Sequence, residues 1–226
     1  GSPKELVFDE VYYVNGAQDY LRDGVETAAG KAEFVVHPPI GKWMIALGIK
    51  IFGDNPFGWR FSAALIGTIS IFLIYLVARK LFHSEKLGLI AAALMSLDGL
   101  HLVMSRTALL DIFLMFFILL SFLALLYDRH WLAALSLGLA LGTKWSALYF
   151  IIALLLLELI INRNLIRTAR IGITSVLIYI STWFGWFNSS LGWDRHAKSN
   201  PLASLLSYHR EMLNFHTGLT ERHSYQ

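Results

Sequence analysis

The run of residues 61–78 contains no Asp, Glu, Lys or Arg, and it is bordered by Arg60 on one side and by Arg79 and Lys80 on the other. A helix needs about 20 mostly apolar residues to cross a bilayer, so this run with its borders is long enough. Only 15% of the 226 residues are charged, against roughly 25% in soluble domains. These observations predict an integral membrane protein.

Further apolar runs follow along the chain. We expect six spans, at residues 61–78, 87–104, 108–127, 131–148, 149–161 and 171–187. Asp98 and His101 interrupt the second run. Asp111 lies near the start of the third run, and Lys144 interrupts the fourth. The fifth run is too short to cross unless it borrows residues from its neighbours.

Basic residues gather in alternate loops between these runs. They are Arg79, Lys80, Lys86, Arg129, Arg163, Arg167 and Arg170, whereas the other loops hold little beyond Arg106. Because basic loops face the cytoplasm, we expect residues 1–57 and 191–226 to be extracytoplasmic and residues 58–190 to form the membrane bundle. The cytoplasmic loops also account for the formal net charge of +3 without a nucleic-acid partner.

Short amphipathic helices are predicted outside the bundle. Apolar residues recur at helical spacing from residue 10 to residue 21, and Gly24 follows as a stop. Pro39 favours the start of a second helix, which we expect to cover residues 39–52 and to end at Gly53. A third helix is indicated at residues 202–215. Trp43 is suited to the membrane interface, where we expect the first two helices to lie.

Charged residues collect on the predicted extracytoplasmic side. Asp9 and Glu10 place two carboxylates there, and Lys42 lies in the first turn of the second helix, where an anion is favoured. The other members of this set are Arg60, Arg106, Asp111 and Lys144. A carboxylate can deprotonate a hydroxyl, and cations can hold a phosphate leaving group. Each residue also has a purely structural interpretation, such as a helix cap at Asp9 or an ion pair between Arg106 and Asp111.

No metal site is predicted. Asp98 and His101 share a helix face, but two residues do not make a metal site, and we interpret them as a polar pair between helices. The scattered histidines His196, His209, His216 and His223 are typical of a hydrated loop. The need for a divalent cation is left open.

Several motifs together resemble the protein O-mannosyltransferases, and their order and spacing agree with that family over nearly the whole chain. The motifs are residues 8–13 (FDEVYY), 36–42 (VHPPIGK), 59–61 (WRF), 104–111 (MSRTALLD) and 143–145 (TKW). Residues 216–220 (HTGLT) look like the bacterial branch in particular.

The resemblance implies an all-α integral membrane enzyme of the GT-C type, a multi-span helical bundle with extracytoplasmic amphipathic helices. Such enzymes transfer mannose from polyprenyl phosphate mannose to Ser or Thr of an unfolded or translocating exported protein, with inversion. The location implied is the bacterial plasma membrane with an extracytoplasmic site, or the endoplasmic reticulum membrane in a eukaryote.

The resemblance also implies roles for individual residues. Asp9 looks like the general base, and Glu10 looks like its partner, which shapes the site or contacts the acceptor. The residues that would hold the donor phosphate or support its site are Lys42, Arg60 and Arg106, with His37 and Lys144 as weaker candidates. Asp111 would orient Arg106.

Two alternatives remain open at this point. The same motifs fit a GT-C enzyme that transfers another lipid-linked sugar to a lipid or glycan. A transporter or channel would instead line a pathway with Arg60, Arg106, Asp111 and Lys144. The sequence has no inverted repeat of the kind that transporters often carry, and helices before the first span favour an enzyme over a pore.

Both ends of the sequence look cut. Gly1-Ser2 is typical of a protease-cleavage remnant, and the chain stops at Tyr225-Gln226 without a terminal signal. Members of the family resembled usually carry a span before the Asp-Glu motif and several spans after the last external loop. We therefore expect the sequence to be part of a longer enzyme.

Overall fold

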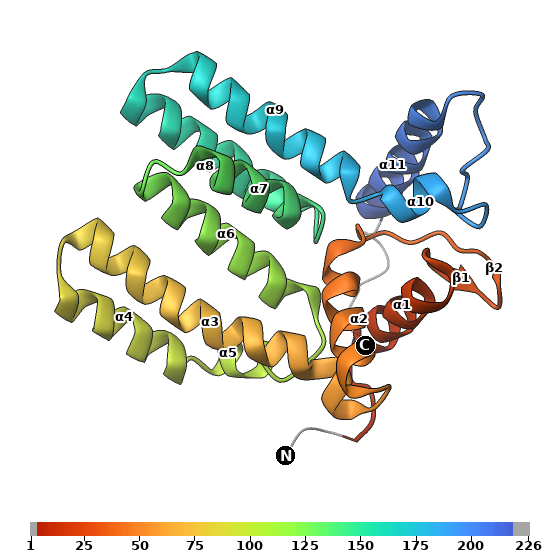
Figure 1. The fold of residues 1–226 in the computed structure, drawn as a ribbon, viewed down its shortest axis with the longest axis horizontal. Coiled ribbons are helices and arrows are strands. Elements are labelled where there is room, and N and C mark those ends of the chain that lie inside the picture. Colours follow the sequence, from red (N-terminus) through yellow and green to blue (C-terminus); the bar gives the residue numbers. More distant parts are fainter. Residues whose placement is uncertain (1–3, 219–226) are drawn as a thin grey trace.

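The computed structural model describes residues 4–218, and this part is helical apart from one two-stranded hairpin (Figure 1). Its elements are α1 (Glu10–Asp23), β1 (Thr27–Ala28), β2 (Lys31–Ala32), α2 (Ile40–Phe52), α3 (Pro56–Phe82), α4 (Glu85–Leu97), α5 (Gly99–Met104), α6 (Leu110–Leu126), α7 (His130–Leu141), α8 (Ala147–Asn162), α9 (Leu165–Ser181), α10 (Phe184–Asn188) and α11 (Pro201–Thr217). The expectations about Gly1-Ser2, residues 219–220 of the last motif, His223 and Tyr225-Gln226 lie outside the described residues.

The helices predicted outside the bundle are present at the expected places. Helix α1 ends at Gly24, which adopts a left-handed conformation with φ 74°, a conformation that glycine adopts without a steric penalty. Helix α2 follows Pro39, and the N–H of Gly53 closes its last turn on Ile49 O at 2.8 Å. Helix α11 covers the stretch predicted at residues 202–215, and its first turn contains a proline, a residue favoured at helix starts.

The six apolar runs are all occupied by helices, but the expectation of six long spans is met only in part. Among the described residues, α3 is the one helix long and apolar enough to cross a bilayer, and α6, α7 and α8 are shorter apolar helices. The predicted boundary between the fourth and fifth spans, after residue 148, is wrong. Helix α7 ends at Leu141 and α8 begins at Ala147, so Lys144 lies in the turn between them.

The second predicted span, residues 87–104, is broken in the middle. Asp98 leaves the helical conformation, and its Oδ1 accepts the N–H of His101 at 2.7 Å, which caps α5. A carboxylate in this position satisfies an N–H group that has no partner within the helix. The interpretation of Asp98 and His101 as a polar pair between helices is therefore wrong, since Asp98 caps the helix to which His101 itself belongs.

Close packing holds the amphipathic helices against the bundle. Figure 1 shows α1, α2, α10 and α11 gathered at one end of the long helices. Gly48 of α2 lies against Gly58 of α3 so closely that an added Cβ would overlap the Gly58 carbonyl oxygen. Small residues are typical of such contacts in membrane bundles, because packing drives association there.

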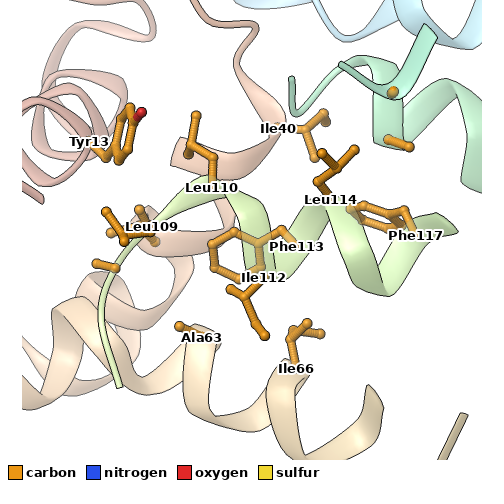
Figure 2. Packing of buried hydrophobic residues seen from close by; sticks show 14 of the residues in the cluster. Tyr13, Ile40, Ala63, Ile66, Leu109, Leu110, Ile112, Phe113, Leu114 and Phe117 are labelled. Atoms are coloured by element: carbon orange, nitrogen blue, oxygen red, sulfur yellow. The ribbon is translucent and has the colours of Figure 1, made fainter. Parts of the chain in front are cut away.

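Helix α6 forms the centre of the buried cluster (Figure 2). Its Ile112 points toward Ala63 and Ile66 of α3. On the α2 side, a Cβ added at Gly41 would lie 2.5 Å from Leu110 Cδ2. Helix α6 therefore fixes α2 and α3 relative to each other, and it begins at the end of the bundle where α1 and α2 lie.

Candidate active site

The Asp-Glu motif begins α1, and its two carboxylates lie in different surroundings. Asp9 precedes the first turn and is partly exposed, whereas Glu10 is fully buried. The buried Tyr13 lies close to the carboxylate of Asp9. Burial raises the pKa of Tyr13, and the carboxylates of Asp9 and Asp111 raise it further. Tyr13 therefore keeps its proton and can donate a hydrogen bond to Asp9.

Glu10 is held by four hydrogen bonds. Its Oε1 accepts Arg60 Nε at 2.7 Å and Ala108 N at 2.7 Å. Its Oε2 accepts Arg60 Nη2 at 2.5 Å and Val7 N at 2.8 Å. Burial opposes ionisation, but these donors and the Arg60 charge outweigh it and lower the pKa of Glu10. This arrangement favours a supporting role for Glu10 over contact with an acceptor.

Arg60 is the buried partner of Glu10. Its side chain is 5% exposed, and its Nη2 also donates to Glu5 O at 2.9 Å. Two parallel contacts between a guanidinium and a carboxylate fix both groups in orientation as well as position. Of the two roles expected for Arg60, the geometry favours support of the site over direct contact with a phosphate.

Lys42 forms a second buried ion pair, with a residue that the sequence analysis did not single out. Its Nζ contacts Glu26 Oε1, and the two side chains are 4% and 5% exposed. Lys42 Nζ also donates to His37 O at 3.2 Å. Burial raises the pKa of Glu26, and the Lys42 ammonium counters that rise. Glu26 lies in the polar segment after Gly24, where the sequence alone gives no signal that its carboxylate is buried.

Asp111 pairs with Lys144 and not with Arg106. Lys144 Nζ lies 2.9 and 3.1 Å from the two Asp111 carboxylate oxygens. This contact joins the first turn of α6 to the turn between α7 and α8. Arg106 is exposed just after α5, and no ion pair joins it to Asp111 in the part of the chain that the structure describes. The expectation that Asp111 orients Arg106 is therefore wrong.

His37 lies near both lysines that the sequence analysis selected. Its ring centroid is 5.8 Å from that of Tyr13 and 5.8 Å from that of His216. Burial, together with the charges of Lys42, Lys144 and His216, lowers the pKa of His37 to about 3. His37 is therefore neutral at pH 7. His216, which was grouped with the scattered histidines, is a second residue that the sequence analysis missed.

These contacts assemble one site from distant segments. Asp9, Tyr13, Asp111, Lys144 and His37 are linked by hydrogen bonds, ring contacts or charge. The buried pairs of Glu10 with Arg60 and of Glu26 with Lys42 adjoin this set. The site therefore contains a partly exposed carboxylate, Asp9, which can accept a proton, and a partly exposed lysine, Lys144, which can hold an anion.

A metal centre is not among the features of residues 4–218. No three or more His, Cys, Asp or Glu side chains gather there in a group that could hold an ion. His37 Nδ1 has no hydrogen-bond partner within the described chain, but its neighbours Lys42, Lys144 and His216 provide no acidic ligand.

Comparisons with known proteins decide the family. A family model described as dolichyl-phosphate-mannose-protein mannosyltransferase matches residues 36–186. The chain belongs to this family. A polyprenol-phosphate-mannose–protein mannosyltransferase from Mycobacterium tuberculosis is 33% identical to it over an alignment of 276 positions, which covers 95% of this chain and 53% of that protein. The chain thus spans about half the length of the curated mannosyltransferases it matches.

Solved structures show the same fold as this mannosyltransferase-family chain. ArnT from Cupriavidus metallidurans in the apo state matches with a TM-score of 0.67 and 17% identity, over 80% of this chain and 37% of that one. The Saccharomyces cerevisiae Pmt1–Pmt2 complex bound to the sugar donor matches with a TM-score of 0.63 and 22% identity, over 80% of this chain and 29% of that one. The chain therefore has a GT-C membrane transferase architecture.

Proposed function

We propose that this chain forms part of a membrane enzyme that moves mannose from polyprenyl phosphate mannose to Ser or Thr hydroxyls of exported proteins. The observation that carries the proposal is that the partly exposed Asp9 and the Asp111–Lys144 pair both lie beside Tyr13. Family membership supports the sugar and the lipid carrier. The site then lies at the extracytoplasmic face of the plasma membrane, or of the endoplasmic reticulum membrane in a eukaryote.

The proposed reaction is a single inverting displacement. Asp9 accepts the proton of the acceptor hydroxyl, and the hydroxyl oxygen bonds to C1 of mannose from the side opposite the phosphate. The bond between C1 and the phosphate oxygen breaks, and the polyprenyl phosphate leaves with the bonding electrons. Lys144, which is partly exposed, holds the phosphate in the bound donor and stays with it as it leaves, and Arg106 is exposed. The Glu10–Arg60 pair and the Glu26–Lys42 pair hold the site in shape.

The test is mannose transfer by membranes that contain the protein, supplied with polyprenyl phosphate mannose and a peptide containing Ser and Thr. We expect Asp9→Asn to lower transfer at least about 100-fold, because loss of a general base costs about 10²–10⁴ in rate. Asp194→Asn is the matched control, since Asp194 has φ 55°, a conformation that asparagine tolerates.

Two results would count against the proposal. Equal transfer by the Asp9→Asn variant and the parent would remove Asp9 from the role of base. Use of an aminopentose phosphate lipid in preference to the mannose donor would assign the chain to the alternative GT-C activity.

A further inference from the structure

A chain of three side chains connects α11 to the turn that carries Lys144. Trp145 Nε1 donates to Tyr179 Oη at 3.0 Å. Tyr179 Oη lies 2.5 Å from His209 Nε2, and His209 Nδ1 lies 2.7 Å from Leu205 O. Tyr179 belongs to α9 and His209 to α11, so the contacts join segments from three parts of the chain. The proposed reaction assigns no role to these residues.

The direction of each hydrogen bond follows from the chemistry of the groups. Leu205 O is a carbonyl and can only accept, so Nδ1 of His209 carries the proton. A neutral His209 then has Nε2 free to accept the Tyr179 hydroxyl proton. Trp145 Nε1 can only donate, so the Tyr179 oxygen receives it. All donors and acceptors are matched, and burial, which lowers the pKa of His209, keeps its ring neutral.

Ring contacts hold the same residues from other directions. The His209 ring lies 5.6 Å from Trp145 and 5.1 Å from Trp183, measured between centroids. Trp145 also lies 6.1 Å from His216, which neighbours His37. Trp145 is therefore fixed on one face by α11 and on its indole N–H by α9. Its backbone neighbour is Lys144, whose ammonium reaches Asp111.

We propose that His209 and Tyr179 are positioning residues, which fix Trp145 and thereby place Lys144 for the phosphate of the lipid-linked sugar donor. The proposal rests on the proposed function. His209 acts through hydrogen bonding and not through bulk, so an amide that can accept the Tyr179 proton replaces it. The effect falls on donor binding, since Lys144 meets the phosphate before the sugar is transferred.

The experiment compares His209→Phe, His209→Gln and Tyr179→Phe in membranes containing the full chain, with His196→Phe as the matched control on an exposed position. We expect His209→Phe and Tyr179→Phe each to raise the KM for polyprenyl phosphate mannose about five-fold, the equivalent of one net hydrogen bond. The kcat and the peptide KM stay within two-fold of the parent. His209→Gln retains most of the donor affinity. The double variant, His209→Phe with Tyr179→Phe, has a donor KM little higher than that of either single variant.

A second measurement does not depend on transfer. The fluorescence of Trp145, taken as the difference between each protein and its Trp145→Phe form, is quenched by acrylamide more strongly in His209→Phe than in the parent or in His209→Gln. Equal quenching in all three overturns the proposal, as does a change confined to the peptide KM or a His209→Gln variant as weak as His209→Phe. A parent that transfers no mannose overturns the proposed function, while the fluorescence still decides whether His209 fixes Trp145.

Discussion

Removing the Glu10 carboxylate provides the sharpest test of how the site is held together. The variant Glu10→Ala leaves the Arg60 guanidinium, which is 5% exposed, without its paired carboxylate. It also leaves the N–H of the fully buried Ala108 without an acceptor. Breaking one side of a buried ion pair costs about 3–5 kcal/mol. We expect Glu10→Ala to lower the free energy of unfolding by an amount in that range.

The assay is denaturant unfolding in detergent micelles, followed by the helical circular dichroism signal. Glu85→Ala is the control, because the Glu85 side chain is 65% exposed and its contact with Arg79 spans 3.9 Å. Such exposed pairs contribute about 0–1 kcal/mol. Pairing Glu10→Ala with Arg60→Met should recover part of the loss, since the double variant no longer buries an unpaired charge. A loss below about 1 kcal/mol for Glu10→Ala would refute this account.

The same carboxylate predicts a dependence on pH. The pKa of Glu10 lies below its ordinary value of 4.5 in the folded protein, because Arg60 and two backbone N–H groups stabilise the ionised form against the cost of burial. Between the two pKa values the unfolded chain binds more protons, so stability falls as the pH falls. The advantage of the parent over Glu10→Gln should be complete above pH 4.5 and shrink below it. An advantage that grows on acidification would contradict the sign of this shift.

Two further variants separate stability from function. Lys144→Met should change the free energy of unfolding by less than about 1 kcal/mol, because the side chains of Lys144 and Asp111 are 28% and 46% exposed. The same variant should raise the KM for the donor. A normal donor KM would exclude Lys144 from phosphate binding. Gly185→Ala should lower unfolding stability by about 1–3 kcal/mol, because its Cβ would overlap the Gly24 carbonyl oxygen. Gly99→Ala, where no atom lies within 4 Å of the added Cβ, is the control, and equal melting of both variants would refute the overlap.

Local signals in the sequence were sufficient for the ends of the amphipathic helices. Gly24, Pro39 and Gly53 mark where α1 ends and where α2 begins and ends, because each acts through the conformation of its own backbone. The break at Asp98 was not predicted. An isolated acidic residue in an apolar run is compatible with a functional charge and with a helix cap. Only the backbone conformation distinguishes these two interpretations.

The sequence did not predict which charged residues pair, because pairing depends on where packing directs each side chain. Arg106 and Asp111 are close in the chain, yet Asp111, in the first turn of α6, contacts Lys144. Lys144 lies in the turn between α7 and α8. Glu26 was passed over because a carboxylate in a polar segment normally faces water. Gly16 lies against this buried pair, and a Cβ there would meet Lys42 Cδ at 3.1 Å and Glu26 Cδ at 3.2 Å. Long-range packing of this kind determines which charges meet.

The four hydrogen bonds to Glu10 also order events during synthesis. Ala108 follows Glu10 by 98 residues, and Arg60 follows it by 50. A ribosome adds about 5–20 residues per second, so about 5–20 s separate the synthesis of this carboxylate from that of its last partner. Until Arg60 is present Glu10 must remain hydrated, because an unpaired buried charge is too costly, and its Oε1 lacks one of its donors until Ala108 follows. Complete docking of α1 onto the bundle therefore waits for the turn before α6, which is synthesised after α3 and α4.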